Sequence, residues 1–204
     1  MINTLQDLVK FTDNLFKELG AKEHFKDVLI NFKVDEENEQ GKLNGPLSAL
    51  PQTYCNVIKK LDITGVLLGG FCLSPYSLKK EKIEGQLRKA FDDPFFPKEF
   101  MDKHRMYQVG SCNTDLICVT AGTEQFTNGE VLLVEEGFDI YNPQDAQIHL
   151  LAKDFEQFLI IAGNFDQVRS EINEDESNYA EKKEEFLDRL KKLKVDEKYY
   201  SAWW

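Results

Sequence analysis

The sequence predicts an α+β fold, because a group of strand-like segments is followed by helical ones. Short apolar runs separated by turn residues read as strands at 107–109, 116–120 and 130–135. A helix is predicted directly after them, from residue 154, and 148–151 is expected to add a short strand. Stretches with helical periodicity occur at both ends of the 204-residue chain.

The first 34 residues are expected to form N-terminal helices. Apolar residues recur at helical spacing from Leu5 to Leu19, and Gly20 ends that stripe. A second, shorter stripe runs from Phe25 to Phe32. The acidic, glycine-containing residues 35–48 are predicted to form a mobile loop.

The next helix is predicted to open at Leu50-Pro51, because proline costs nothing in a first helical turn. Residues 65–73 then read as one buried strand, in which Gly69 and Gly70 indicate a bulge or close backbone packing. Residues 75–105 look like an insertion that contains a short helical segment near 86–91.

The helix after residue 154 has a predicted start and stop. Asp154 and Gln157 have the spacing of a capping box, and Gly163 is expected to end the helix in a left-handed conformation. A charged amphipathic helix follows from residue 175, within a C-terminal helical extension over 165–204. The final Trp203 and Trp204 either dock on the chain's own core, which we favour, or anchor a partner.

Charge and composition narrow the classes of partner. The formal net charge is -11, which disfavours direct binding of nucleic acid and is compatible with a basic protein partner. Acidity that serves only solubility is the alternative. No apolar run is long enough to span a membrane, and no signal peptide is visible. The scattered cysteines therefore read as reduced thiols of a cytoplasmic protein.

Catalytic and metal-binding patterns are not found in the sequence. Neither His24, His104 nor His149 lies in a recognised motif, and the glycines at 65–70 lack the lysine of a phosphate-binding loop. A zinc site from His104, Cys112 and Cys118 would not have the usual paired-cysteine spacing, and Cys118 reads as a buried apolar residue. We therefore predict no enzyme activity, no catalytic residue, no cofactor and no metal.

The order of these segments resembles the SUKH superfamily, which includes the yeast cell-wall-synthesis regulator and many bacterial immunity proteins. LPQTYCNVIKKL at 50–61 looks like the family's early helix, the segment at 109–136 like its central strands, and LAKDFEQFL at 151–159 like its closing helix. The resemblance covers residues 45–164, with 75–105 as an insertion. LDITG at 61–65 replaces the family's usual Asn-Gly after the early helix.

The resemblance implies an α+β fold, with a curved, mostly antiparallel sheet and helices packed against it in one domain. It also implies a non-catalytic protein that neutralises a polymorphic toxin, often a nuclease, by stoichiometric binding. The cognate toxin is expected to be basic, and no oligomeric state is predicted. A regulatory scaffold of the same fold is the first alternative. The second is a small hydrolytic enzyme with acids such as Asp115 and Glu130 in a cleft.

Acidic side chains near the predicted strands are the first candidates for a partner-binding face. Carboxylates accept charge-assisted hydrogen bonds from arginine and lysine, and could take the place of substrate phosphates in a basic nuclease. For any single residue, a solvated strand edge is the favoured interpretation. The candidate set is Asp115, Glu124, Glu130, Glu135, Glu136 and Asp139.

Overall fold

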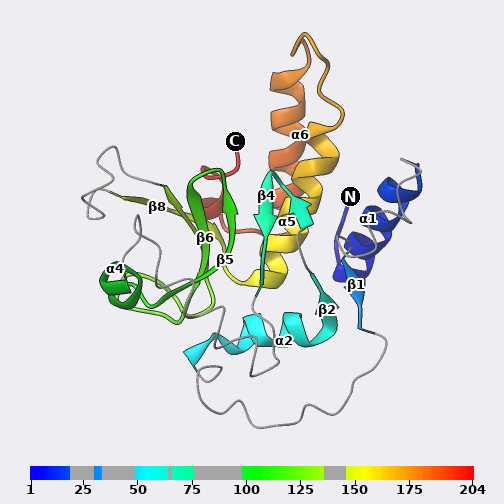
Figure 1. The fold of residues 1–204 in the computed structure, drawn as a ribbon. Coiled ribbons are helices and arrows are strands. Elements are labelled where there is room, and N and C mark those ends of the chain that lie inside the picture. Colours follow the sequence, from blue (N-terminus) through cyan, green and yellow to red (C-terminus); the bar gives the residue numbers. More distant parts are fainter. Residues whose placement is uncertain (19–29, 34–48, 64–65, 76–97, 136–145) are drawn as a thin grey trace.

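A six-stranded antiparallel sheet organises the computed structural model, which describes residues 1–18, 30–33, 49–63, 66–75, 98–135 and 146–204 (Figure 1). The strands lie in chain order, so that each pairs with the next. Their bounds are Val66–Leu68 (β3), Phe71–Leu73 (β4), Met106–Cys112 (β5), Asp115–Thr120 (β6), Val131–Glu135 (β7) and Gln147–Ala152 (β8). The predicted α+β class is confirmed.

Most of the described helices gather around α5, which packs against β3 and β8 of the sheet. The N-terminal and C-terminal helices both contact α5, as does the helix that opens after Pro51. The helical bounds are Leu5–Glu18 (α1), Gln52–Lys60 (α2), Lys98–Lys103 (α4), Phe155–Arg169 (α5), Tyr179–Lys192 (α6) and the short 3-10 helix Glu197–Tyr199 (η3).

Both faces of the sheet carry apolar clusters. Alternate residues of β6 divide between them: Ile117 and Val119 join the main core with α5, whereas Leu116 and Cys118 join a second cluster on the other face. That second cluster includes Phe100 of α4. Because successive side chains of a strand point to opposite faces, a strand buried on both sides reads as a continuous apolar run. The LICV sequence of β6 is such a run.

The predicted single strand at 65–73 is wrong, because the structure has a hairpin of β3 and β4 there. Gly69 and Gly70 form its turn with φ angles of +66° and +83°, which glycine adopts without steric cost. The expected close packing is confirmed at Gly69. A Cβ added to Gly69 would lie only 2.9 Å from the Cβ of Ala162 on α5.

The predicted start of α5 is confirmed, and its predicted end is wrong. The Oδ1 atom of Asp154 accepts a hydrogen bond of 2.8 Å from the Gln157 N–H, while Gln157 Oε1 accepts one from the Lys153 N–H. The helix passes through Gly163 and continues to Arg169. Gly163 is there for packing, because a Cβ would lie 2.6 Å from Cδ1 of Leu8 on α1.

Two further expectations are partly met near the N-terminus. The first helix is confirmed over Leu5–Glu18, but Asn31–Phe32 (β1) pairs with Leu61–Asp62 (β2) as a small antiparallel sheet and does not continue a helix. The expected loop at 35–48 and the helical segment near 86–91 lie outside the described residues. Among the described helices, none has the length and apolarity to cross a membrane.

The C-terminal segment belongs to the main core. Phe186 and Leu190 of α6 are fully buried, and the Trp203 side chain is 4% exposed. The indole Nε1 of Trp203 donates a 2.9 Å hydrogen bond to the Leu151 carbonyl oxygen of β8. The preference for docking of the C-terminus on the chain's own core is therefore confirmed.

Candidate interaction surface

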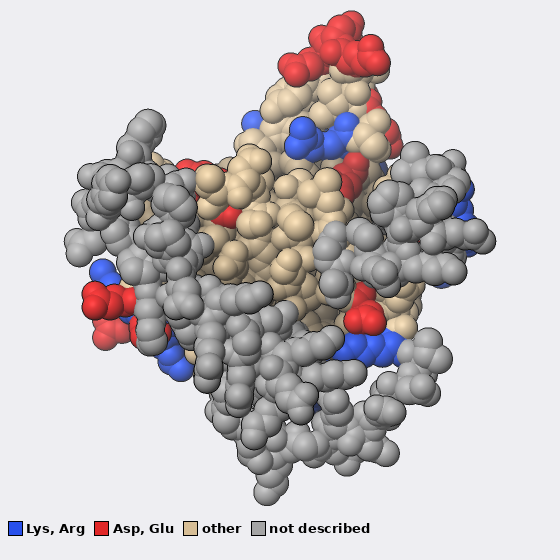
Figure 2. All heavy atoms as spheres, in the orientation of Figure 1, with Lys and Arg blue, Asp and Glu red and all other residues tan. Residues whose placement is uncertain are grey.

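The connection between α5 and α6 projects from the molecule and is acidic. The helix α5 begins just after β8 and runs back along the sheet, and α6 returns beside it, so that residues 170–178 form the outer end of a helical hairpin (Figure 1). Figure 2 shows acidic side chains gathered on this projection. We call its exposed carboxylates the acidic tip: Glu171, Glu174, Asp175 and Glu176.

Local hydrogen bonds fix the backbone of the acidic tip. Asp175 Oδ1 accepts from the Ser177 N–H at 3.1 Å, and Asn178 Oδ1 accepts from the Asn173 N–H at 2.9 Å. Short polar side chains commonly stabilise turns in this way. The hydrogen bonds from Ser177 also lower the pKa of Asp175, so this carboxyl is ionised at neutral pH. Glu174 and Glu176 take no side-chain hydrogen bond from any described residue and point their charge at solvent.

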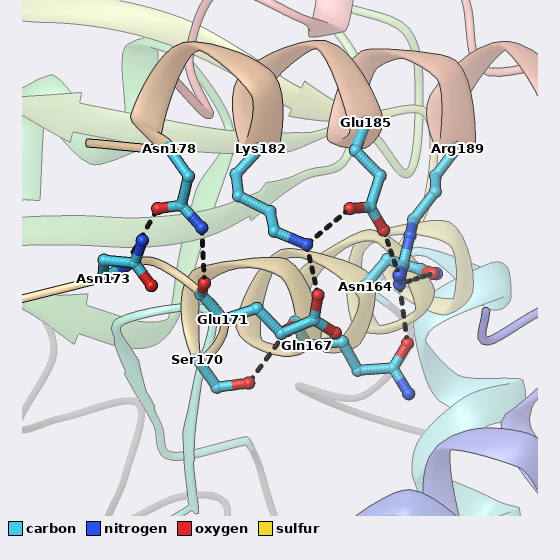
Figure 3. A network of polar contacts seen from close by, with 9 residues as sticks. All are labelled: Asn164, Gln167, Ser170, Glu171, Asn173, Asn178, Lys182, Glu185 and Arg189. Atoms are coloured by element: carbon cyan, nitrogen blue, oxygen red, sulfur yellow. Dashed lines mark hydrogen bonds and ion pairs between the residues drawn. The ribbon is translucent and has the colours of Figure 1, made fainter. Parts of the chain in front are cut away.

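A polar network ties the two helices together below the tip (Figure 3). The Arg189 guanidinium of α6 donates to Glu185 Oε1 at 2.6 Å and to Gln167 Oε1 of α5 at 2.8 Å. Lys182 donates to Glu185 at 2.9 Å and also to Glu171. Hydrogen bonds from Lys182 and Arg189 lower the pKa of Glu185. Lys182 thus opposes the charge of Glu171, while no described lysine or arginine forms an ion pair with the other three carboxylates of the tip.

Aromatic side chains support the hairpin from the core side. The Trp204 ring lies 5.5 Å from the Phe165 ring of α5 and 5.7 Å from the Phe186 ring of α6, measured between centroids. Tyr179, the first residue of α6, lies 5.4 Å from Trp204 and remains 45% exposed. An exposed aromatic ring therefore accompanies the acidic tip.

The structure separates the acids that the sequence suggests. Asp115 begins β6 and Glu135 ends β7, so the register places them at one end of the sheet, where Glu135 Oε2 lies 3.3 Å from His149 Nε2. Glu124 is exposed in the loop after β6, at the opposite end. Glu136 and Asp139 lie outside the described residues. These acids do not form one face.

The structure corrects the prediction that Glu130 belongs to a binding face, because its side chain is buried. It is 2% exposed. Its carboxylate accepts hydrogen bonds of 2.7 Å from the Tyr199 hydroxyl, from Lys198 Nζ and from the Thr127 N–H. A partner cannot reach a carboxylate that these three donors enclose, and its visible role is to hold the C-terminal segment on the sheet.

The residues weighed for a zinc site do not converge. Cys112 packs against the main core, whereas Cys118 belongs to the cluster on the opposite face of the sheet. Burial raises the pKa of the Cys118 thiol far above its ordinary value, as expected for a small apolar core residue. Across the part of the chain that the structure describes, no three His, Cys, Asp or Glu side chains gather as metal ligands.

Sequence reasoning missed the acidic tip, although a signal was present. Four acids fall within 171–176, between two apolar helical stripes, with Asn173 among them and Ser170 and Ser177 on either side. Polar, turn-favouring residues between two helices indicate a short connection whose side chains all face solvent. The prediction instead assigned part of this run to the C-terminal helix, which begins only at Tyr179.

In the comparisons with known proteins, no family model matches the chain, and no curated protein or solved structure is significantly similar to it.

Proposed function

We propose that this chain is a cytoplasmic immunity protein of the SUKH type, which neutralises a cognate basic toxin by stoichiometric binding. The observation that carries the proposal is the acidic tip. It presents three carboxylates that form no ion pair with a described residue, on a projecting hairpin that hydrogen bonds and aromatic contacts hold in place. The net charge of -11 and the resemblance over 45–164 support the same class of function.

The tip has the chemistry to recognise a basic surface. Carboxylates accept short, charge-assisted hydrogen bonds from arginine and lysine, and a field of one sign speeds the encounter with a partner of the opposite sign. Tyr179 lies beside the charges and can add an aromatic anchor of the kind that dominates many interfaces. In a nuclease toxin, these carboxylates would occupy the positions of substrate phosphates and exclude the nucleic acid.

The first test is capture of the partner from native cell extract with the tagged chain, at low and at moderate salt. Bound proteins are identified by mass spectrometry and then tested for toxicity with and without this chain. We expect a basic partner in one-to-one ratio, whose toxicity co-expression suppresses. Capture of resident cellular proteins alone, together with a phenotype on deletion without any toxin, would support the regulatory scaffold and contradict immunity.

Matched charge variants then locate the contact face. Glu174→Gln/Asp175→Asn/Glu176→Gln removes three charges, and the asparagine can still accept the hydrogen bond from Ser177. We expect this variant to bind the partner at least tenfold more weakly. The control Asp62→Asn/Glu99→Gln/Glu197→Gln removes as many exposed charges elsewhere. Asp115→Asn/Glu124→Gln/Glu135→Gln tests the acids suggested by the sequence, and a larger loss there would move the face to the sheet.

The pair of acids named for the enzyme alternative does not share a cleft. Asp115 begins β6, while Glu130 immediately precedes β7, and these two strands are antiparallel neighbours. The two carboxyl groups therefore lie at opposite ends of the sheet, and one of them is enclosed by Tyr199 and Lys198. General acid–base work on one substrate needs both groups within reach of it, so this pair does not support hydrolysis.

A further inference from the structure

A second feature, a polar groove, lies far from the acidic tip. It has a volume of about 420 Å³ and runs between α2, the first turns of α5 and the segment after α6. The acidic tip follows the other end of α5, and a 15-residue helix is roughly 22 Å long. Figure 1 likewise shows α2 at the opposite end of the molecule from the tip. One small contact cannot include both.

Two side-chain amides in the groove are oriented by their own hydrogen bonds. Asn56 Oδ1 accepts from Gln52 Nε2 at 2.8 Å, and Gln157 Oε1 accepts from the Lys153 N–H at 3.1 Å. Each carbonyl oxygen thus has one hydrogen-bond donor, while neither NH₂ group donates to another described residue. Both residues line the groove, one on α2 and one on α5. The two walls thus present donors to whatever lies between them.

The groove also carries two ammonium groups without an acidic partner among the residues that the structure describes. Lys60 ends α2 and Lys153 precedes α5. Two carboxylates also line the groove: Asp154, which accepts the capping hydrogen bond from the Gln157 N–H, and Glu156. The N-terminus of α5 adds a partial positive charge to the same wall.

Four of the side chains that line the groove are apolar. Ile160 and Ile161 come from α5, and Leu193 and Val195 come from the segment after α6. Apolar side chains beside hydrogen-bond donors suit an extended chain better than an isolated ion. The donors can bind peptide carbonyl oxygens, while the apolar side chains accommodate an uncharged side chain.

From this arrangement we propose that the groove binds an extended peptide segment with acidic side chains. Asn56 and Gln157 donate to its backbone carbonyl oxygens, Lys60 and Lys153 bind its carboxylates, and Val195 contacts an apolar side chain. The site is independent of the proposed function, which uses the acidic tip and a basic surface. A partner that engages both features would carry a basic patch and an acidic segment.

The test is an NMR titration of the uniformly ¹⁵N-labelled full chain. The probes are the peptide pools Ac-Xaa-Glu-Xaa-Glu-Xaa-NH₂ and Ac-Xaa-Lys-Xaa-Lys-Xaa-NH₂, with inorganic phosphate as a third arm. We expect only the glutamate pool to shift the side-chain NH₂ signals of Asn56 and Gln157 saturably. Equal shifts from phosphate would make this a simple anion site, and equal shifts from the lysine pool or none at all would overturn the proposal.

Neighbouring lysines on α2 supply a matched control. Lys60 lines the groove, whereas Lys59 does not, although both are exposed in the last turn of the same helix. We expect Lys60→Glu and Lys153→Glu each to weaken binding of the glutamate pool at least tenfold, and Lys59→Glu to change it less than twofold. Equal losses in Lys59→Glu and Lys60→Glu would show a general charge effect and contradict a built site.

Discussion

At the scale of single residues, Glu130 shows how a buried carboxylate can hold the end of a chain in place. Burial by itself raises its pKa, but hydrogen bonds from Lys198, Tyr199 and Thr127 outweigh that effect and lower the pKa below its ordinary value of 4.5. The charged form is thus the one that the fold stabilises. Its contribution to stability is present above pH 4.5 and is lost as the pH falls through the lowered pKa.

We expect Glu130→Gln to lower the free energy of unfolding by about 2 kcal/mol at pH 7, because hydrogen bonds to a charged group become neutral ones. Urea denaturation at pH 7 measures this loss. The difference from the wild type should narrow as the pH falls from 4.5 through the lowered pKa, because the wild-type carboxyl becomes neutral over that range. Glu124→Gln, an exposed acid in the neighbouring loop, is the control. A difference independent of pH would contradict the role of the charge.

Asn164 is a second interior polar residue with a defined structural role. It is fully buried on α5, and its amide binds both the N–H and the carbonyl oxygen of Ile2, at 3.1 and 2.7 Å. Asn164→Ala would leave these two backbone groups unpaired, so we expect a loss of about 2 kcal/mol. Hydrogen exchange in α1 should accelerate as the N-terminus loosens. Asn14→Ala, on the exposed side of α1, should show neither effect.

At the scale of elements, the sequence predicted which helices form better than it predicted the residues at which they end. Helical periodicity identified α1, α5 and α6, because a stripe of apolar residues records which face is buried. The end of α5 was missed because Gly163 is explained by the closeness of Leu8, a tertiary contact that no local rule contains. The β3–β4 hairpin was read as one strand because paired glycines fit a bulge as well as a turn.

The last residues act as a structural element although they form little regular structure. The Trp203 ring is buried within 5.7 Å of the rings of Phe71, Phe158 and Phe165, whereas Trp204 is only partly covered. We expect Trp203→Ala to lower the free energy of unfolding by about 3–5 kcal/mol. Urea denaturation followed by circular dichroism measures this loss. Trp204→Ala should cost about 1 kcal/mol. Similar losses from both variants would mean that the aromatic area of each ring determines its contribution, whatever the depth of its burial.

At the scale of the whole molecule, the sequence gives the acidity of the chain but not the place where its exposed acids gather. The acidity is evident from composition, yet the sheet separates acids such as Asp115, Glu124 and Glu130. The exposed acids of the tip instead lie together because the connection between two helices is short. Which carboxylates face solvent together depends on the hairpin's projection. Charge composition therefore describes the molecule as a whole, while topology determines which carboxylates are exposed together.

The same net charge should make salt act in opposite directions on stability and on binding. At -11 the folded chain repels itself, and the exposed ion pairs that oppose this repulsion are individually weak. Raising NaCl from about 0.05 to 0.5 M shortens the Debye length severalfold, so we expect the Tm to rise by a few degrees. Under the proposed function, the Kd for the basic partner should rise over the same range, because salt screens attraction to the carboxylates of the tip.

The triple tip variant separates the two effects. Glu174→Gln/Asp175→Asn/Glu176→Gln removes repelling charges, so its Tm at low salt should equal or exceed that of the wild type, and its binding should depend less on salt. Differential scanning calorimetry and titration calorimetry measure the two quantities. A Tm that falls with salt would show that pairs such as Arg189 with Glu185 outweigh the repulsion. The exposed ion pairs would then add more to the stability of the fold than the repulsion between its carboxylates removes.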